Sequence, residues 1–131
     1  MKNPSYYVAV FGKPEPPDKD TADSGRFFLG KRGADTPGER GDMLLLYSAP
    51  GPAENVVDSP GMGVVLTKTR EFIYYRYLPF HYPLSKDRID KAFTDEDRKK
   101  LDGIGLNAYW LLDISRESFI NATRGVLIDW P

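Results

Sequence analysis

Short apolar segments separated by polar, turn-forming stretches make up the hydrophobic pattern of this chain. They predict β-strands at about 6–11, 43–47, 61–66, 71–78 and 109–114, because each is rich in β-branched, aromatic or other apolar residues. Two of them, 6–11 and 71–78, end directly before glycine or proline. The segment 43–47 is apolar at every position, which is typical of a central strand covered on both faces. The pattern therefore predicts a β-rich fold built around this strand.

The segment 71–78 alternates between two faces of a strand. One face carries Ile73, Tyr75 and Tyr77, and the other carries Phe72, Tyr74, Arg76 and Leu78. Pro79 is expected to end the strand, because proline has no N–H to donate across a sheet. In the strand before it, Gly61 and Gly63 indicate a bulge or a close backbone approach, which would make room for a ligand.

Helical spacing of apolar residues predicts a short amphipathic helix at about 85–93, with Ser85 as its N-cap. A second helix is expected directly after Thr94, because acidic residues follow this cap and two lysines precede Gly103. The second helix is too polar to be a core helix.

Ser115 is expected to cap a third short helix, whose apolar contacts would be Phe119 and Ile120. Residues 124–130 are expected to form a last strand. The predicted elements are therefore about six strands and two or three helices.

Long loops are expected at about 13–25 and 49–60, because both stretches are rich in proline and polar residues. At 131 residues the chain has the size of one domain, and we expect a single domain over 1–131. Short, mostly antiparallel strands with flanking helices predict an α+β fold with a small barrel or a strongly curved sheet.

Charge and cysteine content limit the classes of function. The formal net charge is −1, so only a local basic patch would draw this protein to nucleic acid. The chain has no cysteine, which excludes disulfides and thiolate ligands and favours a reducing compartment. The first residues lack the apolar core of a signal peptide, and no apolar run approaches the roughly 18 residues of a membrane span. We therefore expect a cytoplasmic protein that does not bind membranes.

Known catalytic patterns find little support in the sequence. His81 is the only histidine, which excludes a two-histidine metal site, and a structural or surface role is its simplest interpretation. The glycine-rich loops that cradle phosphates of nucleotide cofactors do not occur, and most carboxylates fall in polar loop or helix segments. We therefore expect no cofactor, no metal and no catalytic residues.

Aromatic and basic residues are interleaved at several points of the chain. These are Tyr6 and Tyr7, Phe27 and Phe28 with Lys31 and Arg32, Tyr47 with Ser48, and Tyr74 to Tyr77 around Arg76. Aromatic faces stack on bases, and Arg or Lys contacts phosphates, so this mixture suits the binding of an unstacked nucleotide. The same aromatic residues also fill the core of a small β-rich domain, and core packing remains the alternative for each of them.

The order of these segments carries a family resemblance. An aromatic first strand is followed by Phe27-Phe28-Leu29-Gly30-Lys31-Arg32-Gly33, by Gly41-Asp42 before Met43-Leu44-Leu45-Leu46-Tyr47-Ser48, and by Gly61-Met62-Gly63. Over roughly residues 6 to 80 this order resembles the EVE family of the PUA-like superfamily. The sequence departs from the family after the first strand, where Phe11-Gly12-Lys13-Pro14-Glu15-Pro16 replaces the usual Trp and Lys-Ser-Glu-Pro.

The resemblance implies a PUA-like pseudo-barrel with flanking helices and a pocket that accepts a nucleobase. In some relatives this base is a modified cytosine flipped out of DNA. Carried over by position, the pocket residues are Tyr7, Phe28, Lys31, Arg32, Tyr47 and Ser48.

We therefore predict a non-enzymatic nucleic-acid-binding module that recognises a modified or flipped-out nucleobase in DNA or RNA. The near-neutral charge favours, as an alternative, a protein-interaction or small-ligand module on the same fold. An amidohydrolase like those of the neighbouring ASCH family is a minor alternative. Its Gly-x-Lys-x-x-Glu-x-Arg signature is absent, and Gly30-Lys31 and Glu39-Arg40 match pieces of it at the wrong spacing.

Overall fold

The computed structural model describes residues 4–11, 24–28, 38–48, 58–103 and 110–126. Its strands are β1 Tyr6–Phe11, β2 Arg26–Phe28, β3 Met43–Ser48, β4 Asp58–Lys68, β5 Phe72–Ser85 and β6 Trp110–Ile114. Its helices are α1 Lys86–Ala92, α2 Asp95–Asp102 and α3 Arg116–Thr123. The predicted α+β fold is confirmed, with six strands and three short helices in the described ranges.

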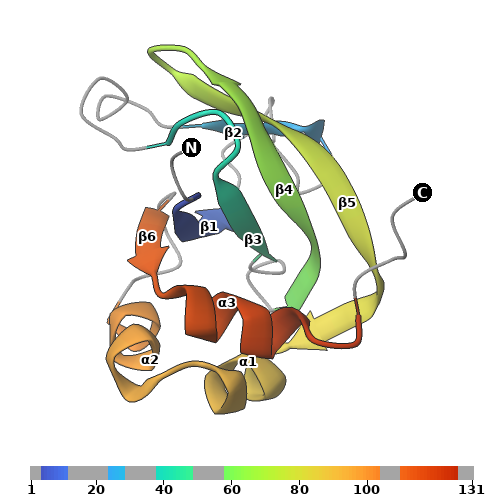
Figure 1. Ribbon diagram of the computed structural model, residues 1–131, viewed down its shortest axis with the longest axis vertical. Helices are drawn as coiled ribbons and strands as arrows, with labels where there is room; N and C mark the ends of the chain where they lie inside the picture. Colours follow the sequence, from blue (N-terminus) through green and yellow to red (C-terminus); the bar gives the residue numbers. More distant parts are fainter. Residues whose placement is uncertain (1–3, 12–23, 29–37, 49–57, 104–109, 127–131) are drawn as a thin grey trace, which may run out of the picture.

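The strands form one strongly curled sheet in the order β2-β5-β4-β3-β1-β6. β1 and β3 pair in parallel, whereas the other neighbouring strands pair antiparallel, as expected. Three strands separate β1 from β2 in this order, yet the rings of Phe11 and Phe27 meet edge to face with centroids 5.1 Å apart. The sheet therefore curls into a half-barrel (Figure 1).

β3 is the central strand that the apolar run predicted. Leu44, Leu45 and Leu46 each have 0% of their surface exposed, although successive side chains point to opposite faces of the sheet. Both faces of β3 are therefore covered, which explains why residues 44–46 are all apolar.

Hydrophobic clusters fill the two sides of the sheet. The cluster inside the curl consists of Tyr7, Ala9, Phe11, Phe27, Leu44, Leu46, Val65, Ile73 and Tyr75. The cluster on the outer side joins strand residues such as Val8, Leu45, Tyr47 and Met62 to helix residues such as Ile89, Leu101 and Phe119. The helices gather at one end of the molecule, and β2 lies at the opposite end (Figure 1). The helices thus cover only part of the outer side.

All three helices begin at the predicted caps. The hydroxyls of Ser85, Thr94 and Ser115 accept hydrogen bonds from the backbone N–H groups of Arg88, Asp97 and Ser118, respectively. Each cap satisfies one of the N–H groups that the first turn of a helix leaves without a partner.

β5 does not end at Pro79 as the sequence predicted. It continues through Pro79 and Pro83 to Ser85. Within the described ranges, β2 pairs with residues 72–74 of β5, and the remainder of β5 pairs with β4 as its one neighbouring strand. A proline in that part of the strand need not donate a hydrogen bond across the sheet, and β5 therefore extends past it.

The loop predicted at 49–60 ends earlier than expected, because β4 begins at Asp58. The pairing of β4 with β5 shifts register between Ser59 and Gly61, so Pro60 lies in a bulge of the strand. Residues 49–57 and most of the loop predicted at 13–25 lie outside the described residues.

The last strand predicted at 124–130 is wrong for residues 124–126, which form a turn after α3. Gly125 has a φ of +80°, which side chains other than glycine rarely adopt and which breaks an extended strand. Residues 127–130 lie outside the described residues.

The close approach predicted at the glycines of β4 is confirmed. A Cβ atom added to Gly63 would lie 2.5 Å from Cδ2 of Tyr75, and one added to Gly61 would lie 2.6 Å from the carbonyl oxygen of Leu78. The space beside Gly63 is therefore filled by the Tyr75 ring of the neighbouring strand, and not left for a ligand.

Candidate nucleic-acid interface

Two of the predicted pocket residues, Tyr7 and Tyr47, are buried on opposite sides of the sheet. Tyr7 is 5% exposed inside the curl, and Tyr47 is 2% exposed in the cluster beneath the helices. In the pairing of β1 with β3, Tyr7 lies opposite Leu44, whereas Tyr47 lies opposite Val10. The structure therefore does not bring these two tyrosines to one common pocket.

The other four predicted residues are described in part or not at all. Phe28 ends β2, where its backbone pairs with that of Phe72, and Ser48 ends β3. Lys31 and Arg32 lie outside the described residues.

The surroundings of Tyr47 carry negative charge from the helices. Burial, and after it the carboxylates of Asp90 and Asp102, raise the pKa of Tyr47 well above its ordinary value of 10.0. Oδ2 of Asp90 accepts a hydrogen bond from Nζ of Lys86 at 2.7 Å, whereas Oδ1 is buried with no partner among the described residues. Nζ of Lys86 also lies 3.9 Å from Oδ1 of Asp102, so this lysine offsets part of the negative charge around Tyr47.

A different set of aromatic and basic side chains lies on the outer side of the sheet at β2 and β5. Tyr75 points into the curl, so the alternation of β5 places Phe72, Tyr74 and Arg76 on the opposite side. Arg26 of β2 pairs with Tyr74 and lies on the same side. We call Arg26, Phe72, Tyr74 and Arg76 the outer β2–β5 face.

The side chains of this face contact one another. The guanidinium carbon of Arg26 lies 4.6 Å from the centroid of the Phe72 ring, a cation–π distance. The ring centroids of Phe72 and Tyr74 are 6.0 Å apart with an interplanar angle of 43°. Arg76 is exposed, and the other three are partly exposed. A guanidinium and two rings thus lie side by side at the surface.

The turn between β4 and β5 adds positive charge at one end of this face. Arg70 is exposed in the turn, and Lys68 ends β4 before it. The N–H of Phe72 donates to the hydroxyl of Thr69 at 3.1 Å, which holds the turn against the first residue of β5. Together the outer β2–β5 face and residues 68–71 carry four basic side chains and one acidic one, in a chain with a net charge of −1.

Tyr74 and Arg76 belong to the interleaved aromatic and basic residues of the sequence, whereas Arg26 and Phe72 had no predicted role in a site. The period-two alternation of residues 71–78 is the signal that assigns Phe72, Tyr74 and Arg76 to one face. The contribution of Arg26 depends on the pairing of β2 with β5, for which the sequence offers no signal.

An apolar groove of about 360 Å³ lies between α3 and the outer side of β3 and β4. Its walls are mostly apolar and include Tyr6, Met43, Met62, Phe119 and Ile120. A pocket of this size and lining suits an apolar side chain or a small apolar ligand better than a charged one.

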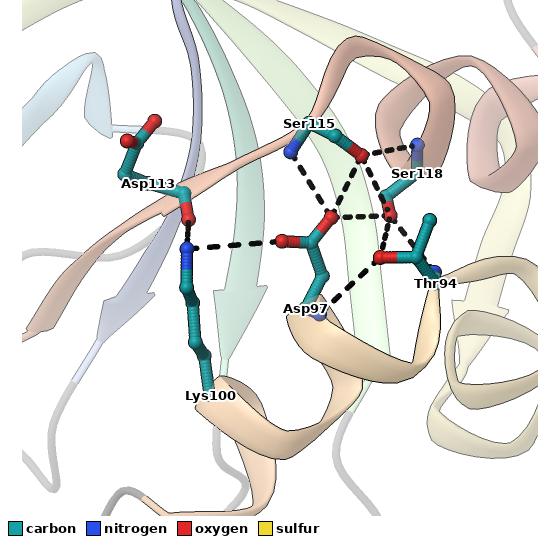
Figure 2. A network of polar contacts seen from close by, with 6 residues as sticks. All are labelled: Thr94, Asp97, Lys100, Asp113, Ser115 and Ser118. Atoms are coloured by element: carbon teal, nitrogen blue, oxygen red, sulfur yellow. Dashed lines mark hydrogen bonds and ion pairs between the residues drawn. The ribbon is translucent and has the colours of Figure 1, made fainter.

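A buried polar network joins α2 to the start of α3 (Figure 2). Oδ2 of Asp97 accepts hydrogen bonds from the backbone N–H of Ser115 at 3.0 Å and from the hydroxyls of Ser115 and Ser118. Nζ of Lys100 lies 3.9 Å from Oδ1 of Asp97 and donates to the carbonyl oxygen of Asp113 at 2.9 Å. The serine hydroxyls point at a carboxylate and at helix N–H groups, so the geometry is that of a helix cap.

The pKa of Asp97 reflects this arrangement. Burial opposes ionisation most strongly, but hydrogen bonds from Ser118 and Ser115 together outweigh it and hold the pKa of the carboxyl below its usual value of 3.8. Asp97 is therefore a buried, ionised anchor between α2 and α3.

Metal-ligand clusters and membrane-spanning helices are absent from the described residues. These contain no group of three His, Cys, Asp or Glu side chains that would hold a metal ion, and His81 is exposed on β5. No helix within the described ranges has the length and apolar character needed to cross a membrane.

Comparison of the chain with known protein families and with curated proteins finds no match in either case.

Proposed function

We propose that this protein is a non-enzymatic module that binds an unstacked nucleobase of DNA or RNA on the outer β2–β5 face. The observation that supports the proposal is the guanidinium of Arg26 lying over the ring of Phe72, with the ring of Tyr74 beside it. Bases stack on aromatic rings and on guanidinium planes, and stacking on an aromatic side chain contributes about 1–3 kcal/mol per base. Arg76 and Arg70 supply positive charge for the phosphates.

The proposed function is the one predicted from the sequence, but the proposed binding site is the outer β2–β5 face and not a pocket that contains Tyr7 and Tyr47. Because Tyr7 and Tyr47 are buried in two separate clusters, a base would have to open the core to stack on either. The outer β2–β5 face is reached without such a change. Recognition of a modified base, as opposed to any unstacked base, rests on the resemblance to the EVE family.

Fluorescence anisotropy of labelled single-stranded oligonucleotides tests the proposal. One oligonucleotide is unmodified and another carries a single methylated cytosine, and both are titrated at about 50 mM and 200 mM salt. The wild type is compared with Tyr74→Ala and with Tyr82→Ala. Tyr82 is a matched control, because it is 51% exposed on the same strand but lies toward the helices, where its hydroxyl accepts a hydrogen bond from Arg88.

The proposal predicts saturable binding that weakens with salt, falls about tenfold or more in Tyr74→Ala and is retained in Tyr82→Ala. Equal affinity for the methylated and unmodified oligonucleotides would refute recognition of this modification while leaving base binding intact. Equal affinity of wild type and Tyr74→Ala would refute the site, and no binding to either oligonucleotide would refute the function.

A protein-interaction or small-ligand module is the second candidate, because the apolar groove beside α3 has the size and lining for an apolar group. Binding of an apolar fluorescent probe would then be insensitive to salt and would fall in Ile120→Glu, which places a carboxylate in the groove. The first candidate predicts that Ile120→Glu leaves oligonucleotide binding unchanged.

A further inference from the structure

We infer that the nucleic acid on the outer β2–β5 face is an extended single strand that runs along β5, with about three nucleotides in contact, and not a single base held in a pocket. This inference rests on the proposed function and specifies the class of ligand. It depends on the spacing of the side chains along β5, on the stacking of Arg26 upon Phe72, and on the distribution of charge.

Spacing along β5 provides the first argument. Side chains on one face of a strand repeat about every 6.6 Å, because each residue advances about 3.3 Å. The centroids of Phe72 and Tyr74 are indeed 6.0 Å apart, and Arg76 occupies the next position on the same side. We call Phe72, Tyr74 and Arg76, with Arg26 over Phe72, the row. Stacked bases in a duplex advance about 3.4 Å along the helix, so the spacing of the row matches a single nucleic-acid strand whose bases are about twice that distance apart.

The contact between Arg26 and Phe72 provides the second argument. With its guanidinium over the ring, Arg26 supplies a flat cationic surface at the first position of the row, and Tyr74 supplies a ring at the second. Both surfaces stack on any base, because every base has a π face. The row therefore holds two neighbouring bases with little dependence on sequence.

Charge at both ends of the row provides the third argument. Arg70 lies in the turn before Phe72, and Arg76 follows Tyr74, so positive charge flanks the two stacking positions. A single strand that crosses both positions brings phosphates near both arginines. In a duplex the base faces are already stacked on one another, so a row of ring and guanidinium surfaces offers it only the phosphate contacts.

Competition binding tests this inference with thymidine oligonucleotides of different length. Unlabelled thymidine monophosphate, dinucleotide, trinucleotide, tetranucleotide and hexanucleotide, together with a duplex of 12 base pairs, compete against a labelled hexanucleotide. The inference predicts that affinity rises at least tenfold from the mononucleotide to the trinucleotide or tetranucleotide and then levels off. The hexanucleotide should bind at least tenfold more tightly than the duplex.

Substitutions link the length dependence to the row. Tyr74→Ala should weaken the tetranucleotide about tenfold or more and the mononucleotide far less, because it removes one stacking position. Tyr74→Phe should retain binding, since the ring remains. Arg70→Ser should lower the slope of log affinity against log salt by about 0.7, the value for one phosphate contact to a single strand. Thermal melting of each variant separates these effects from loss of folding.

The outcomes distinguish failure of the inference from failure of the proposed function. A mononucleotide that binds as tightly as the tetranucleotide, with both weakened by Tyr74→Ala, would overturn the extended row and leave base binding in place. A duplex that binds as tightly as the hexanucleotide would also overturn it. If no oligonucleotide binds, the inference and the proposed function fall together.

Discussion

Replacing Asp97 should lower the stability of the protein more than replacing any exposed carboxylate of α2. The Asp97 side chain is 5% exposed, and one of its oxygens accepts a backbone N–H and two hydroxyl donors. Each hydrogen bond to a charged group contributes about 1.5–3 kcal/mol, and donors left buried without an acceptor add a desolvation cost. Because neighbouring bonds are not additive, we expect Asp97→Ala to cost about 3–5 kcal/mol, in the range for breaking a buried ionic network.

Urea denaturation followed by circular dichroism and tryptophan fluorescence at pH 7 measures this cost. Asp95→Ala is the matched control, because Asp95 lies in the first turn of the same helix with a side chain 83% exposed and pairs only with Arg98 among the described residues. The control should change the free energy of unfolding by less than about 1 kcal/mol. A cost below about 1 kcal/mol for Asp97→Ala would refute the assignment of Asp97 as the anchor between α2 and α3.

The lowered pKa of Asp97 gives this prediction a pH dependence of known sign. A carboxyl that is more acidic in the folded state than its ordinary value of 3.8 stabilises the fold above that value. This contribution is lost as the pH falls from 3.8 through the lower folded pKa. The difference in stability between wild type and Asp97→Asn should therefore be constant from pH 7 to about 5 and shrink in strong acid. A difference that grows with acidity would contradict the reasoning.

Three further substitutions follow from the packing. Gly63→Ala should destabilise by about 1–3 kcal/mol in thermal melting, because its Cβ would meet the Tyr75 ring at 2.5 Å, whereas Gly103→Ala, with its nearest contact at 3.4 Å, should change little. Asp42→Ala should cost about 2–3 kcal/mol and speed hydrogen exchange of the two amides that donate to this carboxylate. In a spectrophotometric titration Tyr47 should keep its proton at about pH 11, so Tyr47→Phe should leave the absorbance change below that pH unaltered. Because the folded pKa of Tyr47 is raised, its protonation contributes stability that declines as the pH rises above 10.0.

Local features of this fold were predictable because neighbouring residues determine them. Ser85, Thr94 and Ser115 cap the three helices because a hydroxyl reaches the N–H three residues on, whatever surrounds the helix. The turn at Gly41 and Asp42 is likewise local, since Gly41 has a φ of +94° and Asp42 accepts the N–H of Glu39 at 2.8 Å.

Features that depend on strand pairing were not predictable from the sequence. Pro79 is tolerated within β5 because β2, as far as the structure describes it, spans Arg26–Phe28 and pairs with the start of β5. No residue near Pro79 signals how short β2 is.

In the candidate site, too, local patterns were predictable from the sequence, whereas features that depend on the tertiary fold were not. Tyr47 and Tyr74 both occur in aromatic strands, and only the curl of the sheet and the placement of the helices bury the first and leave the second partly exposed. The alternation of β5 identified which side chains share a face, whereas the contact of Arg26 with Phe72 arises from the register between two strands far apart in the sequence. The residue types needed to bind a base were therefore visible, but their exposure was not.

Mapping the binding surface by NMR tests the central claim most directly. Two-dimensional ¹H–¹⁵N spectra of the labelled protein are recorded while an unlabelled thymidine tetranucleotide is added. Binding on the outer β2–β5 face predicts that the largest shifts occur at the amides of β2 and of residues 70–77, with little change around Tyr7 and Tyr47. Shifts concentrated in β1 and β3, or spectra that do not change at millimolar oligonucleotide, would contradict it.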